Sequence, residues 1–379
     1  MNMSYRPSRA RSPVSMVRPE GAEAVIAARP SKCRLPTRAN NLLGASTVAA
    51  LVALAWLFLF FGTLRAAASE SSAGTADEPW LERARYAMPF ANRAEWLEFM
   101  SQGGTVDTKP LAVAYPEEEF VGFVSGALAT VERVSFRSGD LVLRGILVHP
   151  AGEGPFPAVV YARGGNREYG KLRFLDVMRM LAIAGSGRVV LAPEYRGEGG
   201  SEGEPELGRG DVDDVIASVE ALTAWSRAET GSLSLVGSSR GGLVAAWALT
   251  RDLDFDAAVL VAPSLDLEAS AERRPELDAA VYAKSVAGYA DDRVGALRRA
   301  SPIHAVDRMA KTPILLLHGT ADWRVHASVS LELSHRLLER DHPHRLVILE
   351  GGNHSLTNHA LWVRQQIESW LSAYASGEG

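Results

Sequence analysis

Three side chains that together can activate a hydroxyl follow one another along the chain, each soon after a short apolar run. Ser239 lies in the stretch GSSRG at 237–241, Asp322 follows PILLLHG, and His354 follows HRLVILEG. A serine hydroxyl needs a base to take its proton, and the base needs an acid that fixes its tautomer. We therefore predict a catalytic triad in which Ser239 is the nucleophile, His354 the base and Asp322 the acid.

Ser239, rather than its neighbour Ser238, fits the nucleophile position. Ser239 has glycine two residues before it and two after it, whereas Val236 and Arg240 stand at those positions around Ser238. A nucleophile elbow needs small residues there, because its strained turn presses them against the neighbouring strand and helix. The apolar run LSLV before the turn and the helix-forming run after it favour an elbow over a plain strand-to-helix turn.

Other residues are alternatives for the acid and the base. Asp266 follows VLVAPSL and is the acid if the loop after that earlier strand supplies it. We expect His318 to be a strand-end histidine bonded to the backbone, and His359 to lie on the final helix. His342 and His344 are expected in a turn before a strand. Because no acidic or cysteine cluster accompanies these histidines, we predict no metal site and no cofactor.

Acyl transfer by such a triad also needs hydrogen-bond donors for the oxyanion. We expect one from the backbone N–H of Arg240, the residue after the nucleophile. We expect the second from the loop RGGN at 163–166, where Gly164 and Gly165 let backbone amides approach closely. Losing one such donor typically slows catalysis by about 10²–10³, so this loop matters almost as much as the triad.

Short apolar runs alternate with amphipathic helical patterns from about residue 130 onward. This alternation is typical of an α/β fold with a largely parallel sheet covered by helices on both faces. The first two runs are joined by a short turn at 138–140, so an antiparallel hairpin is expected to open the sheet. Ligands of such sheets bind outside the carboxyl ends of the strands, where the triad residues fall. The expected strands are TVERVSFRS, LVLRGILVHP, FPAVVYA, GRVVLAP, LSLVG, AAVLVAP, PILLLHG and HRLVILEG, and helices are expected at about 170–184, 211–226, 240–251, 327–339 and 357–375.

Composition divides the chain into four parts. They are a basic head at 1–41, an uncharged apolar run at 42–64, a polar linker or N-terminal extension at 65–125, and the catalytic domain at 126–379. Within the extension we expect one short helical piece around 80–100 and a solvated acidic face at 117–119. Residues 265–305 are rich in helix formers, and we expect them to cover the pocket.

The basic head and the apolar run together predict a membrane anchor. The head carries eight basic and two acidic residues, and the next 23 residues carry no charge. About 20 apolar residues suffice to cross a bilayer as a helix, and basic flanks stay in the cytoplasm. We therefore expect a cytoplasmic N-terminus and an extracytoplasmic catalytic domain, as in a bacterial inner membrane facing the periplasm. The alternative is a signal peptide cleaved after AAA at 66–68, which would release a secreted domain.

Charge and cysteine content argue against other classes of protein. The formal net charge is −5, and the basic head lacks the interleaved aromatic residues of a nucleic-acid-binding segment, so we expect no nucleic-acid partner. The only cysteine, Cys33, lies in the head. The catalytic domain therefore holds no disulfide and no cysteine-ligated metal.

Four stretches carry a resemblance to a known family: SLVGSSRGGLVAAWA, GRGDVDDVIASVEAL, SPIHAVDRMAKTPILLLHGTAD and LEGGNH. They resemble the catalytic domain of prolyl oligopeptidase-type serine hydrolases, within the α/β-hydrolase superfamily, over about residues 130–376. By matching motif positions, the resemblance implies the same roles for Ser239, Asp322 and His354.

Two departures from the family limit what the resemblance implies. Family members often carry Tyr or His before the paired glycines of the oxyanion loop, where this chain has Arg163. We expect Arg163 to pair with Glu168 or Glu194, the alternative being a contact with the oxyanion or a substrate carboxylate. Full-length oligopeptidases also carry a large β-propeller, for which the roughly 65 residues after the apolar run are too few. Peptidase specificity is therefore not implied.

These features predict a membrane-anchored serine hydrolase that cleaves a carboxylic ester or a small amide through an acyl-enzyme intermediate. One alternative is a serine peptidase that trims short peptides by the same chemistry. The other is a catalytically silent hydrolase scaffold that binds a ligand or partner. The complete Ser/Asp/His set argues against the scaffold, because a binding protein has no need of all three.

Overall fold

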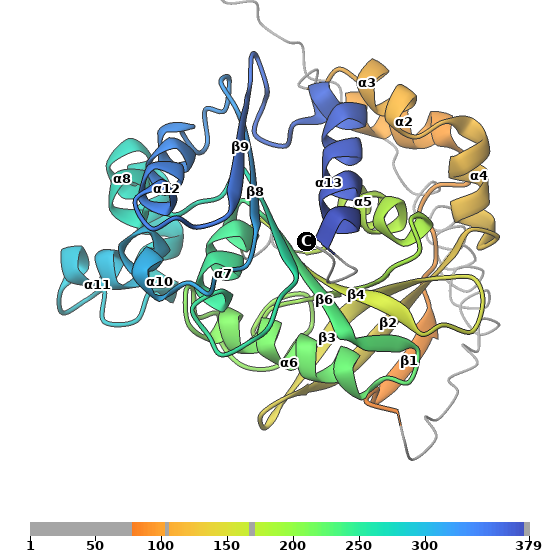
Figure 1. The fold of residues 1–379 in the computed structure, drawn as a ribbon, viewed down its shortest axis with the longest axis horizontal. Coiled ribbons are helices and arrows are strands. Elements are labelled where there is room, and N and C mark those ends of the chain that lie inside the picture. Colours follow the sequence, from red (N-terminus) through yellow and green to blue (C-terminus); the bar gives the residue numbers. More distant parts are fainter. Residues whose placement is uncertain (1–77, 103–105, 167–170, 375–379) are drawn as a thin grey trace, which may run out of the picture. The chain divides into compact units, whose positions relative to one another are not determined.

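A nine-stranded sheet is the centre of the computed structural model, which describes residues 78–102, 106–166 and 171–374. The strands lie in the order β1-β2-β3-β5-β4-β6-β7-β8-β9. The pairs β1–β2, β2–β3 and β3–β5 are antiparallel, and the remaining pairs are parallel (Figure 1). The bounds are β1 Glu82–Arg85, β2 Ala129–Ser138, β3 Leu141–Pro150, β4 Phe156–Ala162, β5 Val189–Pro193, β6 Ala228–Ser238, β7 Ala257–Val261, β8 Ile314–Gly319 and β9 His344–Leu349.

Helices cover both faces of this sheet (Figure 1). On one face lie α6 (Gly210–Ala224), α7 (Arg240–Ala248) and α12 (Ser328–Leu338), and on the other lie α5 (Phe174–Gly185) and α13 (Ala360–Tyr374). Every residue of β5, β7 and β8 is buried, which explains why these strands are continuous apolar runs in the sequence. This is the α/β-hydrolase architecture that the sequence predicts.

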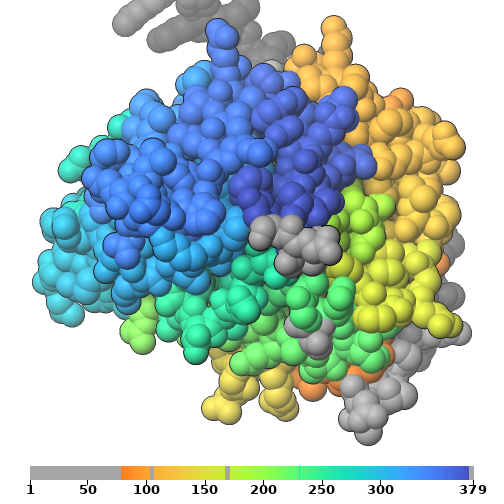
Figure 2. Space-filling model, in the orientation of Figure 1, coloured from red at the N-terminus to blue at the C-terminus, as the bar shows by residue number. Residues whose placement is uncertain are grey.

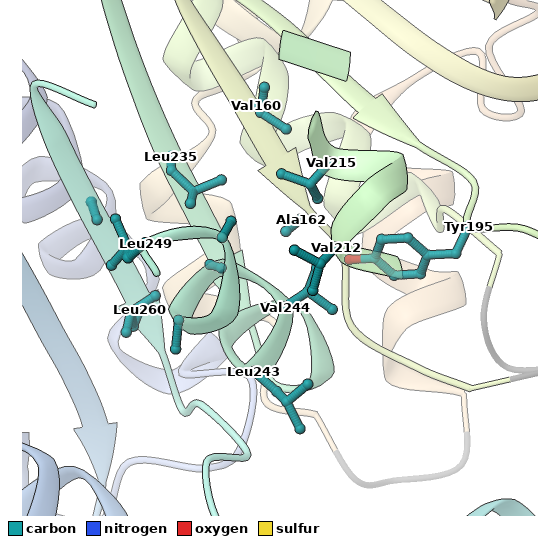
Figure 3. Packing of buried hydrophobic residues seen from close by; sticks show 14 of the residues in the cluster. Val160, Ala162, Tyr195, Val212, Val215, Leu235, Leu243, Val244, Leu249 and Leu260 are labelled. Atoms are coloured by element: carbon teal, nitrogen blue, oxygen red, sulfur yellow. The ribbon is translucent and has the colours of Figure 1, made fainter. Parts of the chain in front are cut away.

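The core on the α7 face fixes the helix that follows the predicted nucleophile. Leu243 and Val244 of α7 pack with Val212 of α6 and with Leu235 and Leu260 of the sheet (Figure 3). All five side chains are at most 1% exposed. Burial of this kind stabilises a side chain by about 1.5–3 kcal/mol, so the position of α7 relative to the sheet is strongly determined.

The eight strands expected from the sequence correspond to β2 through β9. The five expected helices correspond to α5, α6, α7, α12 and α13, the last preceded by a 3₁₀ turn at Thr357–His359. β1 corrects the sequence prediction, which placed a short helical piece around 80–100. Its four residues ERAR have no apolar alternation that would indicate a strand. It is an edge strand, and its pairing with β2 gives it its extended conformation.

The described part of the N-terminal extension contains more regular structure than the one short helical piece expected around 80–100. Besides β1 it contains α2 (Arg93–Ser101), α3 (Lys109–Ala114) and α4 (Glu117–Ser125). Trp96 of α2 is completely buried, stacks on Phe120 of α4 with ring centroids 5.7 Å apart, and meets other rings edge-on. These contacts belong to the core of the α5 face, so the helices are part of the hydrolase unit.

The acidic residues 117–119 are also more than a solvated face. Glu119 forms an ion pair with Arg364 of α13 at 2.5 Å, and Glu117 forms one with Arg93 of α2 at 2.9 Å. Figure 2 shows the orange surface of the extension directly beside the dark blue surface of the C-terminal helix. Charges that a sequence pattern assigned to solvent therefore join two distant segments.

Residues 265–305 form a series of short helices after β7. They are α8 Leu267–Arg273, α9 Pro275–Leu277, a π-helical turn Asp278–Tyr282, α10 Ala283–Ser285 and α11 Arg293–Ala300, followed by a 3₁₀ helix Pro302–Arg308. Asp266 caps α8 by accepting a hydrogen bond from the backbone N–H of Ala269.

The predictions for the basic head, the apolar run and the cleavage site at 66–68 concern residues 1–77, which lie outside the described residues. Within the described ranges, none of the helices has both the length and the apolar character that crossing a membrane requires.

Replacing Trp96 by alanine is expected to lower the free energy of unfolding by about 3–5 kcal/mol, because it leaves a large cavity among packed rings. Urea-induced unfolding measures this loss. Phe99→Ala on the same helix is the matched control, since Phe99 is 54% exposed, and should cost about 1 kcal/mol or less. Equal, small effects of both substitutions would mean that the extension is not part of the cooperative unit.

Candidate active site

The carboxyl ends of β6, β8 and β9 bring Ser239, Asp322 and His354 together. Oγ of Ser239 lies 2.9 Å from Nε2 of His354, and Nδ1 of His354 lies 2.7 Å from Oδ2 of Asp322. When Nδ1–H donates to the carboxylate, the lone pair of Nε2 faces the serine hydroxyl. The geometry is that of a nucleophile, a base and an orienting acid.

Ser239 occupies a strained turn between β6 and α7. Its φ and ψ are 56° and −117°, a positive φ that few residues other than glycine adopt. A Cβ on Gly241 would lie 1.8 Å from the carbonyl oxygen of Ala162, and a Cβ on Gly237 would lie 2.4 Å from the carbonyl oxygen of Gly241. The two glycines that distinguish Ser239 from Ser238 are therefore required by the close approach of backbone to backbone.

Four hydrogen bonds hold the carboxylate of Asp322. The backbone N–H groups of Arg324 and Val325 donate to Oδ1 at 2.9 and 3.0 Å. His354 and His318 both face Oδ2, at 2.7 and 3.2 Å. Burial by itself would raise the pKa of Asp322, but the hydrogen bonds from the two histidines outweigh it and lower the pKa below its usual range. The carboxyl group of Asp322 is therefore ionised at neutral pH.

His318 is a completely buried histidine beside the acid. Its Nε2 lies between the carbonyl oxygen of Val325 at 3.0 Å and the Asp322 carboxylate, both of which are acceptors, so this nitrogen carries the proton. Its Nδ1 then accepts from the hydroxyl of Ser330 at 2.7 Å. The expected bond to the backbone is present, but the sequence did not indicate the contact with Asp322.

The remaining acid and histidines considered in the sequence analysis lie away from the triad. Asp266 caps α8, and His342 bonds to the carbonyl oxygen of Thr312 at 2.8 Å. His344 bonds to the hydroxyl of Ser334, and His359 to the carbonyl oxygen of Glu350. None of these four is hydrogen-bonded to a triad residue in the described part of the chain.

Both predicted oxyanion donors border the nucleophile. A Cβ on Gly164 would lie 3.2 Å from Cβ of Ser239, a tight contact that a side chain could make only if its neighbours shifted. Gly165 has a φ of 84°, which glycine adopts without strain. α7 begins at Arg240, whose backbone N–H precedes the first hydrogen bond of the helix, since it is the amide of Gly242 that donates to the carbonyl oxygen of Ser239 at 2.9 Å. Gly164, Gly165 and Arg240 all line the cavity that contains Ser239.

Arg163 lies beneath this loop with its side chain completely buried. Nε lies 2.8 Å from Oε2 of Glu194 as an ion pair without a directed hydrogen bond, and Nη2 donates to Oε2 of Glu198 at 2.7 Å. Of the two partners expected from the sequence, Glu194 is in contact, and Glu168 lies outside the described residues. Because its side chain is enclosed and paired, we interpret Arg163 as supporting the oxyanion loop rather than binding a ligand.

Glu198 connects the oxyanion loop to the elbow. Besides Arg163 it binds Nη1 of Arg240 at 2.8 Å, while Asp211 of α6 binds Nη2 and Nε of Arg240 at 2.9 and 3.0 Å. Burial alone would raise the pKa of Glu198, but Arg240 and Arg163 outweigh it and lower the pKa. Sequence reasoning missed Glu198 and Asp211, which lie in GEGGSEGEP and GRGDVDD without any spacing that indicates a partner.

A cavity of about 630 Å³ opens beside Ser239 and His354. As expected for residues 265–305, Leu267, Ser270 and Tyr282 of the short helices form one of its walls. A second cavity, of only about 40 Å³, lies on the α5 face and reaches Ser238 rather than the nucleophile.

The sequence profile of the prolyl oligopeptidase family matches residues 175–378. The chain belongs to the prolyl oligopeptidase family. This membership confirms the resemblance stated from the sequence and makes the protein a serine hydrolase by class. The matched range includes Ser239, Asp322 and His354 and stops short of the oxyanion loop.

Relatives of known sequence bear peptidase names. An uncharacterized peptidase of Bacillus subtilis, YtmA, is 27% identical over 213 residues, which are 55% of this chain and 80% of the relative. Dipeptidyl-peptidase 5 of Porphyromonas gingivalis is 24% identical over 229 residues, which are 58% of this chain and 34% of the relative. The chain thus spans most of the first relative and about a third of the second.

Solved structures share the fold at identities below 25%. An acylaminoacyl peptidase of Pyrococcus horikoshii superposes with a TM-score of 0.57 at 22% identity, covering 68% of this chain and 44% of that one. A puromycin-hydrolyzing peptidase of Mycobacterium tuberculosis gives 0.53 at 23% identity, covering 62% and 37%. An esterase of Pyrococcus furiosus gives 0.52 at 18% identity, covering 64% and 91%. These likenesses confirm an α/β-hydrolase fold.

His318→Leu is expected to lower kcat by about tenfold or more, because a hydrogen bond to a charged group contributes about 1.5–3 kcal/mol and Asp322 then holds His354 less firmly. It should also lower the free energy of unfolding. His342→Leu is the matched control: it removes another buried histidine, bonded to Thr312, away from the triad. Ester turnover and urea unfolding of both variants separate an effect on catalysis from an effect on stability. Equal losses of kcat in the two variants would show that His318 has no role beyond stability.

Proposed function

We propose that this protein hydrolyses a carboxylic ester or a small amide or peptide bond through an acyl-enzyme intermediate. The observation that carries the proposal is the chain of hydrogen bonds from Ser239 through His354 to Asp322 beside a cavity large enough for a small substrate. His354 takes the proton of Ser239, whose Oγ attacks the carbonyl carbon. His354 then passes this proton to the leaving group, and the same base activates water for deacylation.

The backbone around the elbow supplies the stabilisation that the tetrahedral intermediate needs. We assign the oxyanion donors to the N–H of Arg240 and to the loop containing Gly164 and Gly165. The amino end of α7 carries partial positive charge, which favours the developing oxyanion. Asp322 keeps the imidazolium of His354 in place after the first proton transfer. No cofactor takes part in these steps.

The size of the cavity and its position beside Ser239 support a small substrate. Small esters and short peptides fit a cavity of about 630 Å³. A peptidase of short peptides uses the same steps and is the second candidate, which the peptidase names of the relatives favour. A silent scaffold is the third. The name of one relative, inactive dipeptidyl peptidase 10 of Mus musculus, records loss of activity in that protein, but a complete set of hydrogen-bonded residues disfavours silence here.

Ser239→Ala is expected to abolish both labelling by a fluorophosphonate probe and hydrolysis of p-nitrophenyl esters, since only an activated serine reacts with the probe. Ser238→Ala, the matched control, should retain labelling and substantial turnover, because Ser238 donates no proton to His354. Undiminished turnover of purified Ser239→Ala protein would overturn the triad and favour the scaffold. Comparing p-nitrophenyl esters with aminoacyl anilides separates esterase from peptidase.

We also propose that residues 42–64 anchor the chain in a membrane, with residues 1–41 in the cytoplasm and the hydrolase domain outside it. The 23 uncharged residues and the eight basic residues before them support this topology. Cleavage after the alanines at 66–68, giving a secreted domain, is the alternative.

A periplasmic reporter such as alkaline phosphatase, fused after Gly379, is expected to be active in a bacterial host, whereas a reporter that works only in the cytoplasm should be silent there. The reverse pattern would contradict the topology. Amino-terminal sequencing of the membrane and soluble fractions distinguishes the two forms, because a mature chain that begins at Ser69 has lost the anchor.

A further inference from the structure

The wall of the catalytic cavity has a marked excess of positive charge. Among the residues that the structure describes, six cationic side chains line it and two acidic ones, Asp176 and Glu276. Of the cations, Arg240 is neutralised by Glu198 and Asp211 behind the wall. Three of the others, Arg173, Arg274 and Arg324, come from separate segments of the chain and form what we term the arginine cluster. The six cations are Arg173, Arg179, Arg240, Arg274, Lys284 and Arg324.

The carboxylates near the arginine cluster do not neutralise it. Asp176 lies 3.6 Å from Arg173, but it also accepts the hydroxyl of Tyr161 and lies 3.7 Å from Arg179. Glu276 pairs with Arg274 at 3.1 Å, yet 69% of its side chain is exposed, where ion pairs contribute little. Among the described residues, no ion pair engages the guanidinium of Arg324.

Trp323 arranges two members of the cluster. Its indole is 73% exposed and directly follows Asp322 in the chain. The guanidinium carbons of Arg274 and Arg324 lie 5.5 and 5.2 Å from the ring centroid, within the range of cation–π contacts. Nε of Arg274 donates to Glu276, and the contact with the exposed ring leaves the other N–H donors of the two guanidinium groups available to a ligand.

The three charges repel one another. Partial burial lowers the pKa of Arg324, and the positive charges of Arg173 and Arg274 lower it further. The carboxylate of Asp322 acts in the opposite direction but does not reverse the shift. An arrangement of like charges is relieved when an anion enters, and a planar carboxylate accepts two parallel hydrogen bonds from a guanidinium.

We propose that the arginine cluster binds a carboxylate of the substrate, so that this hydrolase prefers acidic substrates over neutral ones of the same shape. The proposal rests on the hydrolase function proposed above. The carboxylate has two possible sources, one on the acyl side of the scissile bond and one on the leaving-group side. Both offer the same chemistry to the guanidinium groups.

Two matched pairs of esters test the proposal and distinguish the sources. The acyl-side pair is p-nitrophenyl hydrogen glutarate and p-nitrophenyl valerate, and the leaving-group pair is 4-acetoxybenzoate and its methyl ester. Each kcat/KM is divided by the second-order rate constant for hydrolysis by hydroxide, which excludes the attack of the glutarate carboxylate on its own ester. In at least one pair the acidic ester is expected to be favoured about 10- to 100-fold, the effect of one hydrogen bond to a charged group. The preference should fall as salt is raised from about 0.02 to about 0.5 M.

Arg324→Gln and Arg274→Gln are expected to reduce this acid-to-neutral ratio, chiefly through KM for the acidic ester. Arg299→Gln is the charge-matched control, because Arg299 is 64% exposed, pairs with Asp292 and does not line the cavity. Ratios near one in both pairs for the wild type, or a ratio that survives in the Arg274→Gln/Arg324→Gln double variant, would overturn the carboxylate site alone. Absence of turnover on all four esters, together with unlabelled Ser239, would overturn the hydrolase function and this inference with it.

Discussion

The contact between the turn at Ser239 and the end of β4 is the constraint on which the site depends. Backbone meets backbone there, since the carbonyl oxygen of Ala162 occupies the space that a side chain at Gly241 would need. The loop with Gly164 is thereby held against Ser239 itself. This close approach therefore sets the distance of the candidate nucleophile from the oxyanion loop.

Buried charge reinforces this contact. Glu198 binds Arg163 at the start of the oxyanion loop and Arg240 at the start of α7, so a single carboxylate ties the two halves of the site together. Buried ion pairs often give little net stability, because desolvation offsets their attraction. Their geometry is nevertheless specific, and Tyr195 adds to it, because its ring centroid lies 4.6 Å from the guanidinium carbon of Arg163 and 4.8 Å from that of Arg240. We interpret this network as a positioning device for the loop and the elbow.

The charges of the catalytic cavity are arranged by depth. Carboxylates lie behind the candidate triad, where Asp322 faces two histidines and Asp211 and Glu198 face Arg240. Guanidinium groups lie toward the open side, around Trp323. The deep charges are satisfied within the protein, whereas those at the edge are only partly satisfied. This difference separates residues that hold the machinery in place from residues available to a substrate.

The sequence by itself predicted eight of the strands, five of the helices and the three residues of the candidate triad. Eight strands and five helices carry local apolar patterns, and Ser239, Asp322 and His354 stand at strand ends in the order that an α/β hydrolase requires. The glycines around Ser239 are equally local, since a strained turn leaves a signature in its own pentapeptide.

Only the tertiary structure decided which side chains meet. Glu198 is 35 residues from Arg163 and 42 from Arg240, and Glu119 is 245 residues from Arg364. The pairing of β1 with β2, the burial of Trp96 and the gathering of the arginine cluster likewise depend on segments far apart in the chain. Periodicity reports which face of an element is apolar. The partner of a charge is chosen by distance in space, and no spacing along the chain encodes that distance.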